Sequence, residues 1–351
     1  MLCFGRFLVL LASSVALGDF LSRGFRFDTI RLLNWKRLYQ CLAHFQSNYL
    51  CREMAGAITE LHCSAEFTAG LHAELISLSV ANTFVALSAI LENALILAAL
   101  HRESSLHPPS KLLYRNLAIT DLGVGMVVVP LRMAYWISVV TKSWDICYYT
   151  DLICYAAGYV ICVVSLSTLT VISVDRLLAL KLGLRYKQVV TYKRMRTTVF
   201  AIWIMALVGV SPYFWNARVT SLWGDIILLL CLAISVVAYT KIFFTLRHLQ
   251  IQVNPGQPAQ ATPLNIARYK SAVSSALWVQ VTLVLCYLPA GLAAATTPQT
   301  GITVSRYLAR EILSCLIFLN SSLNPLLYCW KIREVRQAVK DTVNHLFSSS
   351  G

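Results

Sequence analysis

The sequence predicts an all-α membrane protein, a bundle of seven transmembrane helices followed by a short amphipathic C-terminal helix. Three observations support this fold class. The 351-residue chain is 57% hydrophobic and only 13% charged, whereas soluble domains carry roughly a quarter of charged residues. Seven apolar runs are long enough to cross a hydrocarbon core of about 30 Å. Lys and Arg concentrate in the connectors after the first, third and seventh runs, where the positive-inside rule places cytoplasmic segments.

The connectors between the runs are marked by polar, basic or turn-forming residues. HRESSLHPPSKLLYR, KLGLRYKQVVTYKRMR and NPGQPAQATP are expected to be inner loops. TKSWDICYYT, YFWNARVTSLWGD and TPQTGITVSR are expected to be outer loops. Residues 73–330 then form the membrane domain, with spans at about Ala73–Leu100, Leu112–Val139, Leu152–Val174, Thr197–Phe214, Ile226–Leu246, Ala267–Ala295 and Tyr307–Trp330.

The lead, residues 1–72, is expected to lie outside the membrane domain. Residues 1–18 have a short apolar core and small residues at the end, which is compatible with a cleaved signal peptide. The following stretch is unusually basic for a short extracellular lead, with Arg23, Arg26, Arg31, Lys36, Arg37 and Arg52. Two interpretations stay open: a basic extracellular tail behind a signal peptide, or upstream sequence that is not normally made, with Met54 as the working start. The second is favoured.

The tail, residues 331–351, has apolar side chains at helical spacing with basic residues between them. The apolar positions are Ile332, Val335, Val339, Val343, Leu346 and Phe347. This pattern predicts an amphipathic helix lying on the inner leaflet of the bilayer.

The charge and the cysteines exclude other classes of protein. The formal net charge of +14 would suit nucleic acid, but much of it lies in the short connectors, so no nucleic-acid partner is expected. The eleven cysteines have no paired metal-ligand spacing. Cys154, Cys162, Cys231, Cys286 and Cys315 lie in apolar runs and are expected to be small buried hydrophobes. Cys41, Cys51, Cys63 and Cys147 are candidates for the extracellular side, with no pairing assigned.

One polar or proline signature occurs on each of six spans, in chain order. The signatures are Asn93, Asp121, Asp175-Arg176, Trp203, Cys286-x-x-Pro289 and Asn324-Pro325-Leu-Leu-Tyr328. Over residues 75–347 this combination resembles the rhodopsin-like (class A) G-protein-coupled receptors. The resemblance implies a plasma-membrane receptor with an extracellular N-terminus, an extracellular ligand and a heterotrimeric G protein as partner. No catalytic constellation is apparent, so no enzyme activity is expected.

The resemblance also implies an activation switch at the cytoplasmic end. In the family, Arg176 pairs with Asp175 at rest and moves to the tyrosines when the sixth span moves outward. The implied residues are Asp175, Arg176, Tyr239, Pro289, Asn324, Pro325 and Tyr328. Leu177 and Tyr287 depart from the family pattern. Many relatives place an acid where this chain has Tyr269 and Lys270, so raised ligand-free activity is expected.

A carboxylate at mid-membrane depth, Asp121, needs a proton, a cation or hydrogen bonds. The resemblance implies a sodium pocket held by Asp121 and Ser165 within a polar network of Asn93, Asp121, Ser165, Asn320, Ser321 and Asn324. A dry hydrogen-bond network around a protonated Asp121 is the alternative. Beyond a structural Na⁺, no cofactor is expected.

The sequence limits the class of ligand mainly by excluding amine and retinal ligands. Gly158 stands where amine receptors carry their ligand-pairing Asp, and Phe318 stands where opsins carry the retinal lysine. Glu92, Cys231 in place of a proline, and SLHPP after the first span resemble the melanocortin, lysophospholipid, cannabinoid and adenosine group. In that comparison Asp151 matches an acid with which melanocortin receptors hold a basic peptide; a simple charge at a helix N-terminus is the alternative. The expected ligand cavity is Asp151, Tyr155, Gly158, Tyr287 and Phe318.

Peptide, lipid and nucleoside ligands stay open, and two other functions compete. Leu177 and Tyr287 motivate a receptor-like protein that no longer signals. A transporter would need repeats of broken helices, and no such repeat is seen.

Overall fold

The computed structural model describes residues 63, 64, 68, 70–102, 106–252, 278, 281–293, 303–331 and 333–348. Within these ranges the fold is helical and has no strand. The elements of the first half are α6 (His72–Arg102), α7 (Pro108–Gly123), the π-helical turn η2 (Val124–Val128), α8 (Val129–Val140) and α9 (Trp144–Leu182). Then follow η3 (Gly183–Arg185), α10 (Tyr186–Val189), α11 (Tyr192–Val210), η4 (Ser211–Phe214), α12 (Ala217–Gln252), α14 (Val304–Lys331) and α15 (Arg333–Ser348).

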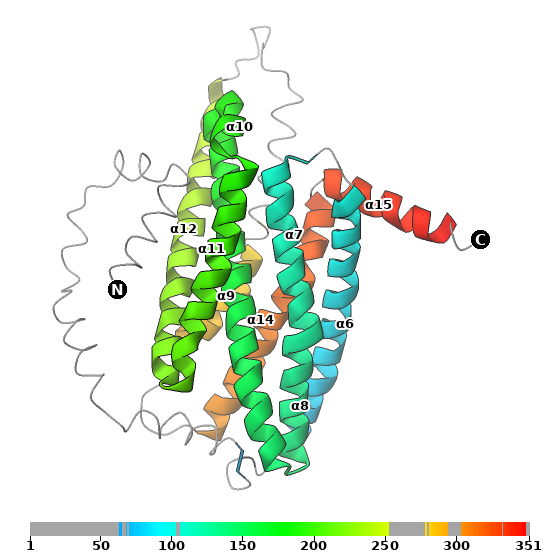
Figure 1. Cartoon of the computed structure of the whole chain (residues 1–351), viewed down its shortest axis with the longest axis vertical. Helices are drawn as coiled ribbons and strands as arrows, with labels where there is room; N and C mark the ends of the chain where they lie inside the picture. Colours follow the sequence, from blue (N-terminus) through cyan, green and yellow to red (C-terminus); the bar gives the residue numbers. More distant parts are fainter. Residues whose placement is uncertain are drawn as a thin grey trace, which may run out of the picture.

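The long helices run side by side as a bundle (Figure 1). Five described stretches are long and apolar enough to cross a membrane: His72–His101, Pro108–Val140, Trp144–Val189, Tyr192–Tyr213 and Val219–Thr245. The described part of the sixth span is the shorter apolar helix Val281–Ala293, and α14 supplies the seventh. The protein is therefore a multi-pass membrane protein, as the composition predicts.

The helices extend further than the hydropathy indicates. Helix α9 begins at Trp144 rather than near Leu152, and α12 begins at Ala217 rather than at Ile226. Most of the expected outer loop at 213–225 is therefore helix, and that expectation was wrong. Hydropathy marks only the part of a helix that lies in hydrocarbon, whereas the backbone hydrogen bonds continue into the polar interface.

The second span contains a π-helical turn that the sequence analysis did not predict. Between α7 and α8, residues Val124–Val128 form η2, whose extra residue shifts the helical register of everything after it. Gly125 allows the turn to lie against α6, because a Cβ there would sit 3.0 Å from the Ala86 carbonyl oxygen. The turn decides which side chains of α8 face the bundle interior.

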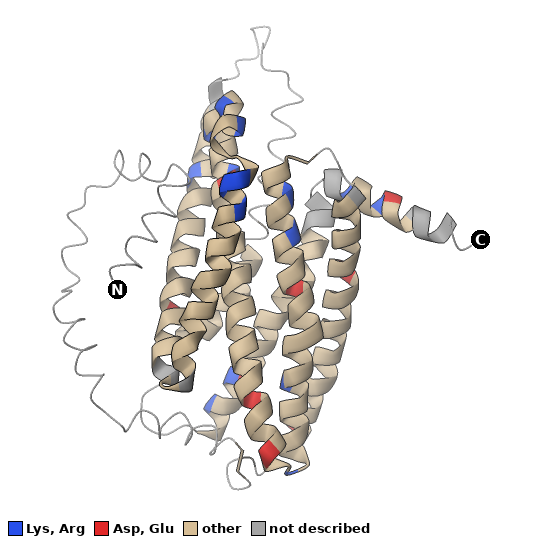
Figure 2. Ribbon diagram, in the orientation of Figure 1, with Lys and Arg blue, Asp and Glu red and all other residues tan. Residues whose placement is uncertain are grey.

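The two ends of the bundle differ in charge. Lys and Arg gather at the end that carries α10 and the first turns of α7 and α11 (Figure 2). Helix α15 leaves the bundle at the same end (Figure 1) and packs against α6, with Ala338 and Thr342 buried. The opposite end holds the junction of α8 and α9, where a disulfide joins Cys63 to Cys147. The structure thus separates a basic end from a disulfide-bearing end.

Candidate functional site

An ion pair lies at the basic end of α9. The Arg176 Nη2 atom is 2.9 Å from Asp175 Oδ2. The Asp175 side chain is fully buried and accepts two further hydrogen bonds, from the Ser110 hydroxyl at 3.1 Å and from the Tyr186 hydroxyl at 2.6 Å. Three residues, Ser110 of α7, Arg176 of α9 and Tyr186 of α10, therefore bind this one carboxylate.

The surroundings of Arg176 are aromatic. Its guanidinium lies 6.0 Å from the centre of the Tyr114 ring. Tyr239 is buried, and its hydroxyl accepts a hydrogen bond from Ser173 at 3.1 Å. Arg176 is the more exposed partner of its ion pair, with 28% of its side chain accessible. The arginine is thus held by its own neighbour and is partly exposed at the basic end of the bundle.

His107 lies just before α7 and borders the same carboxylate. Its ring lies 5.2 Å from the ring of Tyr186. Burial lowers the pKa of the His107 imidazole, against an opposing pull from Asp175. A lowered pKa favours the neutral form at pH 7, so His107 adds no second positive charge beside Asp175.

A second carboxylate network lies in the middle of the bundle. Asp121 is fully buried and accepts hydrogen bonds from the Asn324 amide at 2.9 Å and from the Ser165 hydroxyl at 3.4 Å. The Asn93 amide donates to the Ser321 carbonyl at 3.0 Å. Helices α6, α7, α9 and α14 therefore meet through polar contacts at this depth.

This network has acceptor capacity left over. Within the described part of the chain, the side-chain carbonyl oxygens of Asn320 and Asn324 are buried and have no hydrogen-bond partner. Asn324 contacts Asp121 through its amide nitrogen, so its free carbonyl oxygen belongs to the same network as the Asp121 carboxylate and the Ser165 hydroxyl, and these three side chains offer oxygen ligands. Alkali and other hard cations prefer oxygen ligands, so these residues fit a sodium ion chemically.

A third polar link connects the middle of three helices. The Trp203 indole on α11 donates to Asn116 at 2.9 Å, and the Asn116 amide donates to the Thr168 hydroxyl at 2.8 Å. The sequence analysis singled out Trp203 but missed Asn116. Asn116 is a polar residue within an apolar span, five residues before Asp121 in the segment NLAITD, and this position could have marked it as a buried hydrogen-bonding residue.

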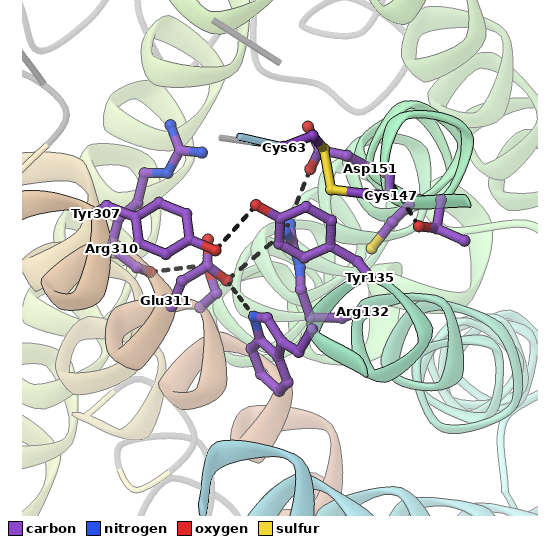
Figure 3. Close-up of polar contacts among 12 residues, drawn as sticks. Cys63, Arg132, Tyr135, Cys147, Asp151, Tyr307, Arg310 and Glu311 are labelled. Carbon is purple, nitrogen blue, oxygen red and sulfur yellow. Dashed lines mark hydrogen bonds and ion pairs between the residues drawn. A yellow bond between two sulfur atoms is a disulfide. The ribbon is translucent and has the colours of Figure 1, made fainter. Parts of the chain in front are cut away.

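The disulfide end contains a buried ionic cluster (Figure 3). Arg132 on α8 lies 3.4 Å from an Asp151 oxygen and 3.6 Å from a Glu311 oxygen. The Trp136 indole donates to Glu311 at 3.0 Å. The hydroxyls of Tyr135 and Tyr307 lie 2.9 Å apart. The cluster joins α8, α9 and α14.

The sequence analysis missed Arg132 and Glu311. Charged residues within membrane spans are rare and mostly functional, so that rule applied to the second and seventh spans would have found both. Asp151 is the eighth residue of α9 and is buried against Arg132. The alternative of a water-exposed charge at a helix N-terminus was therefore wrong.

The comparisons with known proteins agree with this architecture. Residues 92–222 match the family described as "7 transmembrane receptor (rhodopsin family)". The matched range includes Asn93, Asp121, Asp175, Arg176 and Trp203. This match and the relatives below support a rhodopsin-like (class A) receptor. The seven-helix fold class and the receptor family predicted from the sequence are confirmed.

Individual relatives differ in how much of the receptor they cover. "Adenosine receptor A3" of Ovis aries is 26% identical over 278 residues, 72% of this chain and 85% of that protein. "Adenosine receptor A3" of Bos taurus is 25% identical over the same length. "5-hydroxytryptamine receptor 1D" of Mus musculus is 31% identical over 154 residues, 42% of this chain and 38% of that protein. The adenosine receptor matches are compatible with the subgroup suggested by the sequence.

The other residues of the ligand cavity expected from the sequence are packed among aromatic and apolar side chains. The Tyr155 ring stacks on Tyr213 of η4, with centroids 4.1 Å apart. A Cβ at Gly158 would lie 3.4 Å from Val128. Tyr287 and Phe318 are buried in two different apolar clusters. Asp151 and Tyr155 share α9 but have different partners, an ion pair and an aromatic stack.

Some residues of the expected switch can be placed only in part. Pro289 lies in the helix Val281–Ala293, and Pro325 is buried within α14. Tyr328 belongs to α14, but its side chain lies outside the described part of the structure, as do Tyr269, Lys270 and residues 1–62. Of the five cysteines expected to be buried, Cys154, Cys231 and Cys286 are buried, whereas Cys162 and Cys315 are only partly buried.

Proposed function

We propose that the receptor binds an extracellular ligand and activates heterotrimeric G proteins at the plasma membrane. The observation that carries this proposal is the Asp175–Arg176 pair at the basic end of the bundle. An arginine beside a cytoplasmic mouth, held by a neighbouring carboxylate, is an element with two states: paired, or released toward a partner. The resting state is the paired one.

The orientation is supported by two features at opposite ends. Disulfides persist in oxidising compartments, so the Cys63–Cys147 bond supports an extracellular location for its end of the bundle. The basic end carries α10 and the start of α11 (Figure 2), which suits the cytoplasm. The N-terminal lead is therefore extracellular in this proposal.

Raised ligand-free activity follows from the chain itself. No acid stands at Tyr269 or Lys270 to hold Arg176 from the sixth span. The resting state then depends on Asp175 and on the two hydroxyls that bind it, from Ser110 and Tyr186.

A sodium ion is proposed to bind beside Asp121. Asp121 and Ser165 would hold it, with the free amide oxygens of Asn320 and Asn324 completing the set. When bound, the ion supplies the positive charge that a buried carboxylate needs. These side chains come from α7, α9 and α14, so an ion there favours the arrangement in which the three helices converge.

Among peptide, lipid and nucleoside ligands, we favour a nucleoside or another ligand without a basic anchor. Asp151, the acid expected to hold a basic peptide, already faces Arg132. The relatives that cover most of this chain are named adenosine receptors. An amine salt bridge at Gly158 stays excluded because that residue has no side chain.

The deciding experiment needs no ligand. Express the chain from Met1 and from Met54, confirm surface delivery, and record basal activation of a panel of G proteins. The test variant is Arg176→Ala, and Arg185→Ala, an exposed arginine on η3, is the matched control. Basal activity that disappears only in Arg176→Ala supports the proposal. Silence of the unmodified receptor at normal surface density contradicts the raised basal activity and favours a relative that does not signal.

A further inference from the structure

The ionic cluster at the extracellular end shares no residue with the Asp175–Arg176 pair of the proposed cytoplasmic switch. Arg132 and Asp151 come from the consecutive helices α8 and α9, whereas Glu311 comes from α14, near the C-terminal end of the bundle. Their side chains are 11%, 11% and 1% exposed. Buried charges are retained only where they are paired, and removing one partner leaves the others uncompensated. The cluster therefore fixes the relative position of α8, α9 and α14.

Hydrogen bonds from uncharged side chains reinforce the contact between α8 and α14. The Trp136 indole binds Glu311 at 3.0 Å, and Tyr135 meets Tyr307 at 2.9 Å. Tyr307 precedes Glu311 by four residues, so both lie on one face of α14. The outer turns of α14 are thus held to α8 at two successive levels.

An apolar layer covers the cluster on the extracellular side. Tyr135, Trp136 and Tyr307 are part of a buried group whose other members are Cys63, Leu71, Leu75, Val139 and Cys147. Cys147 lies one turn before Asp151 on α9, and its disulfide anchors Cys63 over this region (Figure 3). The layer excludes water, and electrostatic contacts are stronger in such surroundings.

Among the described residues, Arg310 is a further charged group that acts on Asp151. It precedes Glu311 on α14 and is exposed. Arg132 is the buried cation between the two acids, so the helix contacts depend on it.

Helix α14 links this cluster to the centre of the bundle. Glu311 and Asn324 are 13 residues apart on α14, about 20 Å along its axis. The single proline inside α14 is Pro325, just beyond Asn324, so the segment between them is an uninterrupted helix. A shift or rotation of the outer turns is therefore transmitted to Asn324, which binds Asp121 at 2.9 Å.

We propose that Arg132, Asp151 and Glu311 form an extracellular clasp that holds α14 against α8 and α9 and keeps the Asp121 network in its resting arrangement. The same structure that contains the clasp has Arg176 paired with Asp175. The clasp therefore belongs to the resting state, and opening it favours release of Arg176. The signalling consequence rests on the proposed receptor function; the positional consequence does not.

The test uses Glu311→Gln and Arg132→Gln in the full-length receptor. The matched controls are Asp145→Asn and Arg306→Gln, exposed charges at the same end of α9 and α14. Spin labels on the exposed outer ends of α8 and α14, at Thr141 and Val304, report the separation of the two helices. We expect both clasp variants to broaden this distance distribution and to raise basal G-protein activation at least about threefold, while the controls match the unmodified receptor.

A further variant keeps the test possible if the charge variants Glu311→Gln and Arg132→Gln do not fold. Tyr135→Phe removes one α8–α14 hydrogen bond without burying an unpaired charge, and its effect is expected in the same direction and smaller. If the distance between the spin labels is unchanged in Glu311→Gln, the clasp is overturned. If the charge variants fail to reach the cell surface, an unchanged distance in Tyr135→Phe overturns it instead. Changed distances with basal activity that stays at the unmodified level overturn the coupling to Arg176. Absence of G-protein activity in every variant, with distances changed, retains the positional clasp and refutes the proposed function instead.

Discussion

The hydroxyl of Tyr186 offers the sharpest test of how the resting state is held. Tyr186→Phe removes one oxygen atom and leaves the ring against His107. Two hydroxyl groups donate hydrogen bonds to the Asp175 carboxylate. The bond that is lost, from Tyr186, is the shorter one, 2.6 Å against 3.1 Å for the bond from Ser110. Hydrogen bonds to charged groups contribute about 1.5–3 kcal/mol. Because the site borders solvent and water replaces part of the bond, we expect the resting state to lose about 1–1.5 kcal/mol.

That loss converts into signalling through the two-state equilibrium. A change of about 1.4 kcal/mol is tenfold in an equilibrium constant. If about one receptor in a hundred is active without ligand, Tyr186→Phe raises this fraction to roughly one in ten. Ligand-free G-protein activation, normalised to surface density, is therefore expected to rise between about fivefold and tenfold.

The control is Tyr192→Phe, because Tyr192 is an exposed tyrosine at the start of α11. It is expected to leave basal activation unchanged. Basal activation in Tyr186→Phe that equals or falls below the unmodified receptor would refute the argument. In that case the hydroxyl either does not stabilise the paired state or serves the active state equally well.

Three further changes test other parts of the bundle. Cys63→Ser opens an 84-residue loop and is expected to lower thermal stability in detergent by at most about 4.5 kcal/mol; an unchanged melting temperature would contradict a structural disulfide. Asp121→Asn removes the carboxylate, so any rise in melting temperature on replacing choline chloride by sodium chloride should vanish, and a retained rise would place the sodium effect elsewhere. Trp203→Phe leaves the buried Asn116 oxygen without its indole donor and should destabilise the receptor by about 1–3 kcal/mol. Trp215→Phe, at an exposed position, should not.

The mid-membrane network shows how much the sequence alone can predict. A carboxylate at mid-membrane depth needs partners, and the family resemblance implied that Asp121, Ser165 and Asn324 belong to one polar network. The structure brings these three side chains into hydrogen-bonding distance. Apolar length similarly predicted where the spans lie, because the bilayer imposes that length.

The disulfide-bearing end was less predictable because several of its contacts join distant segments. Cys63 and Cys147 are 84 residues apart, and spacing alone does not fix disulfide connectivity. Arg132 lies after a π-helical turn, so periodicity counted from Asp121 does not give its direction. Its partner Glu311 is on another helix. Only the packed bundle shows that these charges meet.

Helix α9 connects three buried carboxylate sites at different depths of the membrane. It supplies Asp151 to the outer cluster, Ser165 to the central network and Asp175 to the inner pair. Asp151 and Asp175 are 24 residues apart, about 36 Å along the helix. At each depth at least one partner comes from another helix, Ser110 and Tyr186 in the case of Asp175, so the position of α9 relative to the other helices is set by polar contacts at three points.

Apolar packing alone would not give such discrete positions. Leucine-like surfaces in lipid slide with little change in free energy, because lipid tails are as apolar as the helices. A buried carboxylate that loses its partner is destabilised by several kcal/mol, so each site favours a paired arrangement over intermediate ones. Three such sites on one helix make the bundle switch between a few arrangements rather than deform continuously. That property is what a receptor needs to transmit an extracellular event to Arg176.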